Sequence, residues 1–314
     1  MKILGYDEVD WQQALELNLI GFDWYLTPDL VKNILKADKR VPKGFAIYAV
    51  EKGSVLGQVG VLVDKIQTTN GEEKLGYLWC IVTRPNEVKK GVATLLIEEA
   101  HARLKAENAR YSFLGTQKSL IAHNLFRKLG YFDLISYNTG FKACSEIKSG
   151  SREVDFNPIC DEKMIAAIFS QYSQNLLGFV HRPKNFVSIR KAWGWMPLDL
   201  IGLFLKNNNM AGYVLGINEG GIVKIRELCC PNSQDISGCI SALERELKPK
   251  HILFHFISRK SIICCLENRG FRFINPTYST YMIKDLKEKQ KISDIQRSFG
   301  IESNKFQMTS IDYY

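Results

Sequence analysis

The feature that most constrains the fold is an internal repeat, because landmarks of the first half recur in the second half in the same order. The matches are residues 18–22 with 175–179, Pro28 with Pro183, Gly57 with Gly212, Pro85 with Pro231, and Gly130-Tyr131 with Gly270-Phe271. The offset between matches only shrinks along the chain, as it would in a second copy of one fold with shorter loops. We therefore expect the same fold twice.

The boundary between the copies is predicted near residue 150, where Ser149, Gly150, Ser151 and Arg152 form a polar, turn-forming stretch. We predict a first domain over residues 1–148, a second over 149–285 and a C-terminal extension over 286–314. With 314 residues, 46% of them hydrophobic and 24% charged, the chain is long enough for two domains that each bury a core.

Charge and cysteine content limit the partners of the chain. The net charge of +9 favours polyanions, a class that includes nucleic acids, anionic membranes and phosphate-rich cofactors, and charge alone does not choose among them. The eight cysteines lack the paired spacing of a zinc site, so we expect reduced core residues and no metal. The N-terminus does not read as a secretory signal, and no apolar run approaches membrane-spanning length. We expect a soluble, cytoplasmic protein.

Local patterns in the first copy predict an α+β order with a mixed sheet flanked by helices in three layers, α/β/α. The expected elements are a helix starting at Thr27-Pro28-Asp29, a hairpin over 45–64, a strand over 75–83, a helix lined by Val92, Leu95, Leu96, Ala100 and Leu104, a strand over 111–114, a helix over 119–129 closed by Gly130, and a strand over 131–141.

Residues 83–96 carry the most informative chemistry, because a strand end there feeds a loop and then a helix start. Such a junction leaves backbone N–H groups without intrahelical partners, directed at one point along the positive end of the helix dipole. Gly91 and Ala93 lack bulk, and Lys89 and Lys90 add positive charge. The junction is therefore predicted to bind a phosphate-bearing ligand.

This junction resembles motif A of the GNAT superfamily of N-acyltransferases, Q/R-x-x-G-x-G/A, over residues 88–93, and residues 122–131 resemble motif B, usually A-x-x-L-Y-x-x-x-G-F. The chain is identified as a tandem, two-domain member with acetyl-CoA as cosubstrate. The resemblance implies that each domain has a splayed sheet and that pantetheine lies between two parting strands. The implied cofactor contacts are Ile81, Val82, Thr83, Lys89, Lys90, Gly91, Val92, Ala93, Thr94, Ser119, Phe126 and Arg127.

Three positions depart from the family pattern. Val88 replaces the first Gln or Arg of motif A, and Phe126 replaces a tyrosine that protonates the leaving thiolate in many members. The strand before Arg84 has no carboxylate, and Tyr77 stands at the position where many members have a glutamate base. The general acid and base are therefore unassigned, and positioning with water as the proton carrier is a sufficient mechanism.

Weak candidates for proton transfer are Tyr77, Tyr131 and His181, although packing is the better explanation for both tyrosines. His181 belongs to a basic turn with Arg182 and Lys184, which either lines an acceptor pocket or is a solvated loop. The resemblance also puts Phe22, Trp24 and Tyr25 at the wall of the acceptor site, with core packing as the alternative.

The second copy has lost the features of a phosphate site. In residues 230–238 the glycine is one place late, the paired lysines are missing, and Asp235 would repel phosphate. We expect this domain to be degenerate and to bind no CoA.

The leading hypothesis is an N-acetyltransferase that moves an acetyl or related acyl group from acyl-CoA to an amine. The alternatives are a CoA-binding regulatory or scaffold protein without turnover, and a tRNA-dependent aminoacyl transferase of the tandem GNAT-like kind. The partners expected are acyl-CoA and an amine-bearing acceptor, and we expect neither a membrane nor a nucleic acid.

Overall fold

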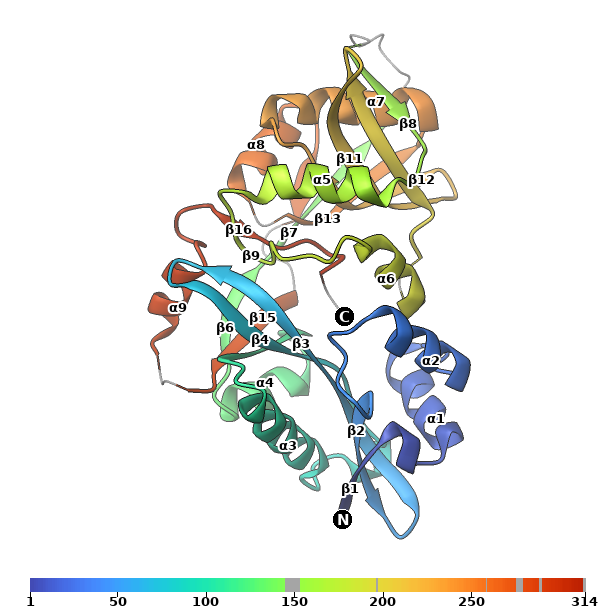
Figure 1. Ribbon diagram of the computed structural model, residues 1–314, viewed down its shortest axis with the longest axis vertical. Coiled ribbons are helices and arrows are strands. Elements are labelled where there is room, and N and C mark those ends of the chain that lie inside the picture. Colours follow the sequence, from blue (N-terminus) through green and yellow to red (C-terminus); the bar gives the residue numbers. More distant parts are fainter. Residues whose placement is uncertain (145–152, 196, 258, 275–278, 288–289, 313–314) are drawn as a thin grey trace.

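The computed structural model describes residues 1–144, 153–195, 197–257, 259–274, 279–287 and 290–312. These residues form two lobes, each built on a twisted mixed sheet with helices on both faces (Figure 1). The predicted boundary near residue 150 lies outside the described residues. No helix of the described part is both long and apolar enough to cross a membrane.

The lobes repeat one order of elements. The first copy comprises β1 (Lys2–Gly5), α1 (Trp11–Phe22), α2 (Pro28–Ala37), β2 (Ala46–Glu51), β3 (Ser54–Thr68), β4 (Gly71–Thr83), α3 (Val92–Ala106), β5 (Tyr111–Gln117), α4 (Ile121–Lys128), β6 (Phe132–Ser136) and β7 (Asn138–Ala143). The second comprises β8 (Val154–Asn157), α5 (Glu162–Ser173), α6 (Phe186–Trp193), β10 (Leu200–Lys206), β11 (Asn209–Glu219), β12 (Ile222–Cys229), α7 (Ile236–Leu247), β13 (His251–Ile257), α8 (Lys260–Glu267), β14 (Arg272–Ile274) and β15 (Ser279–Asp285).

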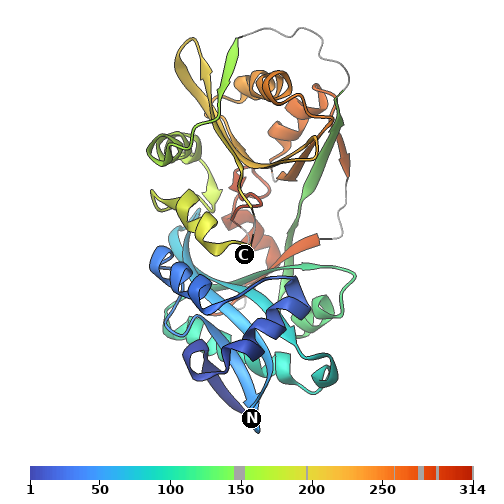
Figure 2. The ribbon, with the colours of Figure 1, turned by 90° about the vertical axis from the view of Figure 1, so that its right-hand side faces the viewer.

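The last strand of each copy belongs to the sheet of the other. The first sheet has the order β1-β2-β3-β4-β5-β15-β6, and the second has β8-β10-β11-β12-β13-β7-β14. β7 pairs antiparallel with β13, and β15 pairs antiparallel with β5, so the exchange is reciprocal (Figure 2). The strand predicted over residues 131–141 is thus two strands, β6 and β7, that lie in different sheets.

Each sheet is covered on both faces, which confirms the predicted three-layer α+β architecture. In the first lobe Leu17 of α1 and Ile34 of α2 pack into one core, and Leu96 of α3 and Phe126 of α4 pack into the core on the opposite face. In the second lobe α5 and α6 cover one face and α7 and α8 the other. Burial of these apolar faces holds the helices on the sheets.

Two pairs of repeat landmarks occupy equivalent places in the structure, and the pair of residues 18–22 and 175–179 does not. Gly57 and Gly212 each sit where a Cβ would lie within 3 Å of a carbonyl oxygen of the next strand, which explains the glycine at both places. Gly130 and Gly270 both have positive φ after the helix that they close. Residues 18–22 end α1, however, whereas residues 175–179 follow α5 and include the short strand β9 (Leu177–Gly178). That match in sequence is not a structural one.

Residues beyond β15 complete the core between the lobes. α9 (Ile292–Ser298) packs beside β6, and β16 (Phe306–Gln307) pairs with β9, which in turn pairs with β3. Phe306, Met308 and Ile311 are buried. The stretch predicted as an extension is therefore integrated into the fold through these residues.

Candidate functional site

The junction between β4 and α3 has the geometry of an anion site. A single 3-10 turn, Pro85–Glu87, follows β4, and Gly91 caps α3 with a φ of 85°. Lys89 also has a positive φ, 67°, so the loop turns sharply twice before the helix starts. Among the described residues, the backbone N–H groups of Val92, Ala93 and Thr94 have no hydrogen-bond acceptor. These donors point along the positive end of α3.

Side chains around this loop set its charge. Lys90 pairs with Glu87 at 3.2 Å, so its charge is partly neutralised, whereas Lys89 has no carboxylate partner among the described residues. Arg84 anchors the start of the loop through Val55 O at 2.6 Å and Glu16 at 2.9 Å. Val88 is 46% exposed and offers no donor where motif A has one. The loop therefore presents mainly backbone donors, with the Lys89 side chain beside them.

β4 and β5 part beyond the core of the sheet. They pair in parallel only at Leu75 with Tyr111, Gly76 with Ser112 and Tyr77 with Phe113. Farther along, the facing edges of both strands carry backbone N–H and C=O groups that a ligand with amide groups can pair with. This parting is the splay that the family resemblance implies.

A β-bulge changes the direction of β4 where β4 and β5 part. The pairing of β3 with β4 shifts between Gln58 and Gly60, and Cys80 takes a φ of 45°. The buried Gln58 side chain donates to Cys80 O at 3.4 Å and exchanges hydrogen bonds with Asn18 at 2.8 and 3.0 Å. The bulge is therefore held by a buried polar pair.

A cavity of about 550 Å³ opens at the splay and reaches the second lobe. It is lined by Phe22, Leu78, Trp79, Cys80, Ile81, Gly115, Thr116, Gln117, Leu120, Ala122, Phe126, Tyr137, Trp195, Pro197, Arg226, His255, Phe256, Ser279, Thr280, Tyr281 and Ser310. These residues come from both copies and from the C-terminal segment. Among the described residues of the wall there is no Asp or Glu, so its ionisable charge comes from Arg226 and His255.

The predicted cofactor contacts fall in two groups. Ile81 and Phe126 line the cavity, and Val82 and Thr83 continue along β4 toward the anion loop. Ser119 and Arg127 are exposed, one after β5 and the other on α4. The assignment of all these residues to CoA contacts remains a prediction.

The proton-transfer candidates lie outside the cavity wall. Tyr77 is buried against Phe113, with ring centroids 5.4 Å apart. Tyr131 is also buried, and its hydroxyl is 2.7 Å from His101 Nε2 and 2.6 Å from Ser112 Oγ, while burial raises its pKa. His181 is 3.3 Å from Gln67 Oε1. The catalytic roles remain untested predictions.

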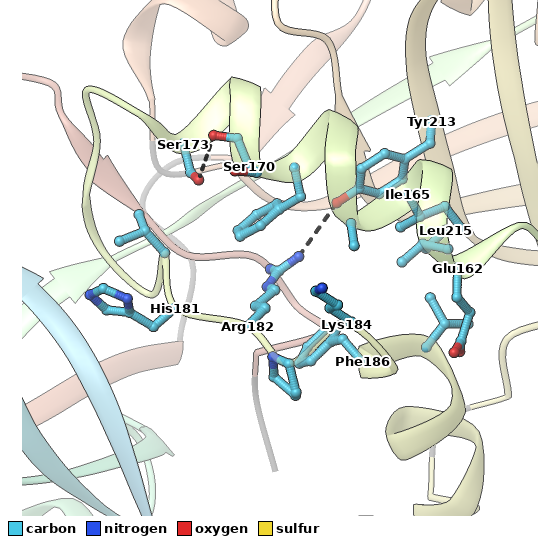
Figure 3. A pocket seen from close by; sticks show the side chains of 15 residues that line it. Glu162, Ile165, Ser170, Ser173, His181, Arg182, Lys184, Phe186, Tyr213 and Leu215 are labelled. Carbon is cyan, nitrogen blue, oxygen red and sulfur yellow. Dashed lines mark hydrogen bonds between the residues drawn. The ribbon is translucent and has the colours of Figure 1, made fainter.

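The basic turn after α5 lies outside the large cavity wall, with Arg182 shielded and Lys184 exposed. Arg182 is buried between two carboxylates, with Nη2 2.7 Å from Glu227 Oε2 and 2.7 Å from Asp312 Oδ1. It also stacks 3.9 Å from the Phe169 ring centroid. Together with His181 it lines a separate cavity of about 200 Å³ in the second lobe (Figure 3). Arg182 therefore fastens the C-terminal segment to β12.

The three aromatic residues before α2 lie in different environments. Phe22 lines the large cavity, Trp24 is buried in the core, and Tyr25 is 68% exposed. Sequence reasoning did not single out Arg226 and His255, which the second copy contributes to the cavity wall. The available signal was a charged or polar residue that interrupts the apolar strands at residues 222–229 and 251–257.

The corresponding junction of the second copy lacks the loop. A 3-10 turn, Ser233–Asp235, runs directly into α7, so the stretch that corresponds to residues 88–91 is absent. Asp235 precedes α7 and its carboxylate lies 2.8 Å from Lys206 Nζ. Next to it, a Cβ on Gly238 would lie 2.7 Å from Val154 Cγ2. A negative charge and close packing thus occupy the helix start, and the loss of a phosphate site there stays a prediction.

Comparisons with known proteins agree with this geometry. The model of the acetyltransferase (GNAT) family matches residues 10–131. Comparison with curated sequences finds no match. Among solved structures, a probable N-acyltransferase from Enterococcus faecalis V583 is similar, with a TM-score of 0.70 and 12% identity over 91% of this chain and 72% of that one.

Two further structures extend the likeness. A GCN5-related N-acetyltransferase from Kribbella flavida has a TM-score of 0.66 and 15% identity over 91% of this chain and 72% of that one. The N-myristoyltransferase of Saccharomyces cerevisiae with bound myristoyl-CoA has a TM-score of 0.59 and 7% identity over 90% of this chain and 82% of that one. At these identities the likeness concerns the fold. The acetyltransferase (GNAT) family model thus matches the first copy over residues 10–131, and the likeness to the solved structures extends the shared fold over nine tenths of the chain.

Proposed function

We propose that the protein is an N-acyltransferase that moves an acetyl group from acetyl-CoA to an amine acceptor. The observation that carries the proposal is the continuity of β4, which lines the cavity at Ile81 and leads through Thr83 to the free N–H groups at the start of α3. A pyrophosphate at those donors would let the pantetheine arm follow the unpaired edge of β4 to the cavity.

In this reaction the amine nitrogen attacks the thioester carbonyl carbon, the C–S bond breaks, and CoA leaves as a thiolate. The amine proton passes to water, and the thiolate takes up a proton from solvent. Backbone N–H groups along the splayed edge of β4 are suited to stabilise the negative charge that develops on the carbonyl oxygen.

The cavity wall offers little acid–base assistance. Phe126 has no proton to donate, and no carboxylate occurs in the described wall. Burial, followed by the charges of Arg226 and Lys224, lowers the pKa of His255 from 6.5 to about 4. Its imidazole is therefore neutral near pH 7 but accepts a proton poorly. Catalysis would rest on positioning and on polarisation of the carbonyl.

A charge substitution in the anion loop tests the proposal. Gly91 has a positive φ and no atom within 4 Å of a would-be Cβ, so Gly91→Asp and Gly91→Asn fit the space equally and carry the same backbone strain of about 1 kcal/mol. Only the aspartate adds a negative charge against the pyrophosphate. Titration calorimetry should find acetyl-CoA affinity lowered roughly a hundredfold in Gly91→Asp, about 3 kcal/mol, and far less in Gly91→Asn.

Equal affinities in the two folded variants would show that CoA binds elsewhere. Turnover is then measured by thiol release on a panel of amines, with the parent protein and with Gly91→Asp. A protein that binds acetyl-CoA tightly but transfers acetyl to no amine would be a CoA-binding regulatory protein instead.

A further inference from the structure

Arg226 is an unusual cation in the cavity wall. It lies at a bulge of β12, opposite the register shift between Leu215 and Gly216 of β11, and lines the cavity beside His255. Its Nε is inaccessible to solvent and has no hydrogen-bond partner. Its backbone oxygen accepts a hydrogen bond from the Ser310 hydroxyl at 3.0 Å. The guanidinium is therefore held at the wall without a counter-ion among the described residues.

Three other shielded arginines of the described residues, Arg40, Arg110 and Arg182, do have such partners. Arg40 binds Asp38 and Asp64, and Arg182 binds Glu227 and Asp312, all within 3.2 Å. Arg110 is 2.9 Å from Glu73. A partly buried guanidinium without a counter-ion loses hydration without an ionic partner in return, and burial lowers the pKa of Arg226 accordingly. A ligand that brings an anion to Arg226 would supply the missing partner.

The rest of the wall suits an anion with an apolar body. Tyr137, Phe256 and Tyr281 form an aromatic cluster with ring centroids 4.4 to 5.9 Å apart, and Phe22 lies 5.5 Å from Trp195. His255 is uncharged near pH 7, so Arg226 carries the only formal charge of the described wall. Because the described wall has no carboxylate, a polycationic acceptor would find no negative charge to pair with there.

We propose that the acceptor is an amine that also bears a carboxylate, as an amino acid does, and that Arg226 binds this carboxylate while the amine faces β4. The proposal rests on the proposed acyl transfer, because it specifies the acceptor of the same cavity. A guanidinium is suited to this role because its planar fork matches a carboxylate with two parallel hydrogen bonds. Arg226 is thereby a specificity-determining residue supplied by the second copy.

The first test compares matched acceptors. Acetyl transfer is measured with an equimolar mixture of L-amino acids and with the mixture of their carboxamides, which keep the amine and lose the charge. The parent should prefer the acids. Arg226→Gln should lower kcat/KM for the acids about a hundredfold and leave the amides within about threefold, and Arg226→Lys should recover part of the loss.

The matched control is Lys224→Gln, which removes one positive charge from the same strand at a residue outside the cavity wall. It should leave the preference for acids unchanged. Acetyl-CoA affinity should be the same in Arg226→Gln and in the parent. Amides acetylated as well as acids, or a loss of acetyl-CoA affinity in Arg226→Gln, would overturn the assignment.

A binding experiment separates this proposal from the acyl-transfer proposal. Phenylacetate has a carboxylate and an aromatic body but no amine, so calorimetry reports on Arg226 without turnover. Binding that Arg226→Gln abolishes and Lys224→Gln preserves supports the carboxylate site even if no amine is acetylated. No binding to the parent, or equal binding to the parent and Arg226→Gln, would reject it.

Discussion

At the scale of single residues, His101 makes the stability of the first lobe depend on pH. It is buried in α3, 2.7 Å from the Tyr131 hydroxyl, and burial, followed by the charges of Lys284 and Lys105, lowers its pKa from 6.5 to about 4. Between these values the unfolded chain binds a proton that the folded chain does not. The free energy of unfolding should therefore fall as pH drops from about 6.5 toward 4.

Urea unfolding at pH 7 and pH 5 measures this effect, which should amount to at most roughly 1.4 kcal/mol per pH unit from this residue. His101→Gln should show a smaller difference between the two pH values than the parent does. His255, whose pKa is lowered in the same direction, should account for part of what remains. An unchanged pH dependence in His101→Gln would mean that His101 is not the group involved.

Tyr77 provides a second residue-scale prediction. Because its ring is buried beside Phe113 and it does not line the cavity, Tyr77→Phe should leave turnover within roughly tenfold of the parent, whereas general acid–base residues contribute about 10²–10⁴-fold. Steady-state kinetics with the best acceptor checks this. A larger loss at unchanged acetyl-CoA affinity would assign Tyr77 to proton transfer.

At the scale of elements, the two strand-to-helix junctions should differ in stoichiometry. The loop of residues 88–91 precedes α3 only, and Asp235 occupies the start of α7. Native mass spectrometry should therefore find one acetyl-CoA per chain. Asp235→Asn, which removes the negative charge but restores no loop, should still bind one. A second molecule bound to either protein would contradict the asymmetry.

Elements whose signals are local could be predicted from the sequence. The hairpin turn at Lys52 and Gly53, the capped start of α2 and the closing Gly130 depend on turn and cap chemistry within a few residues. The strand exchange could not be predicted, because β7 and β15 occupy equivalent places in the repeat and a strand pattern does not specify its sheet. Similarly, nothing near Arg182 or Arg226 in the sequence shows which arginine is paired. Arg182 binds the carboxylates of Glu227 and Asp312, which lie far from it in the sequence.

At the scale of the whole molecule, neither copy should be stable alone. A fragment of residues 1–144 retains β7 without β13 and lacks β15 beside β5, so its sheet is interrupted between β5 and β6. When the fragments 1–144 and 153–314 are produced separately, we expect each to be insoluble or to unfold without a cooperative transition. Co-produced, they should assemble and recover acetyl-CoA binding. A soluble fragment 1–144 that binds acetyl-CoA by itself would argue against the exchange.

The reciprocal exchange also has a consequence for synthesis on the ribosome. β5 ends at Gln117, but its partner β15 ends at Asp285, so the first sheet is incomplete until most of the chain has emerged. At typical elongation rates this interval lasts roughly ten to thirty seconds, during which the edges of β5 and β6 stay unpaired. Nascent chains of this protein should therefore be held by chaperones through that interval, and its yield should depend on them more than that of a GNAT domain whose strands are all contiguous.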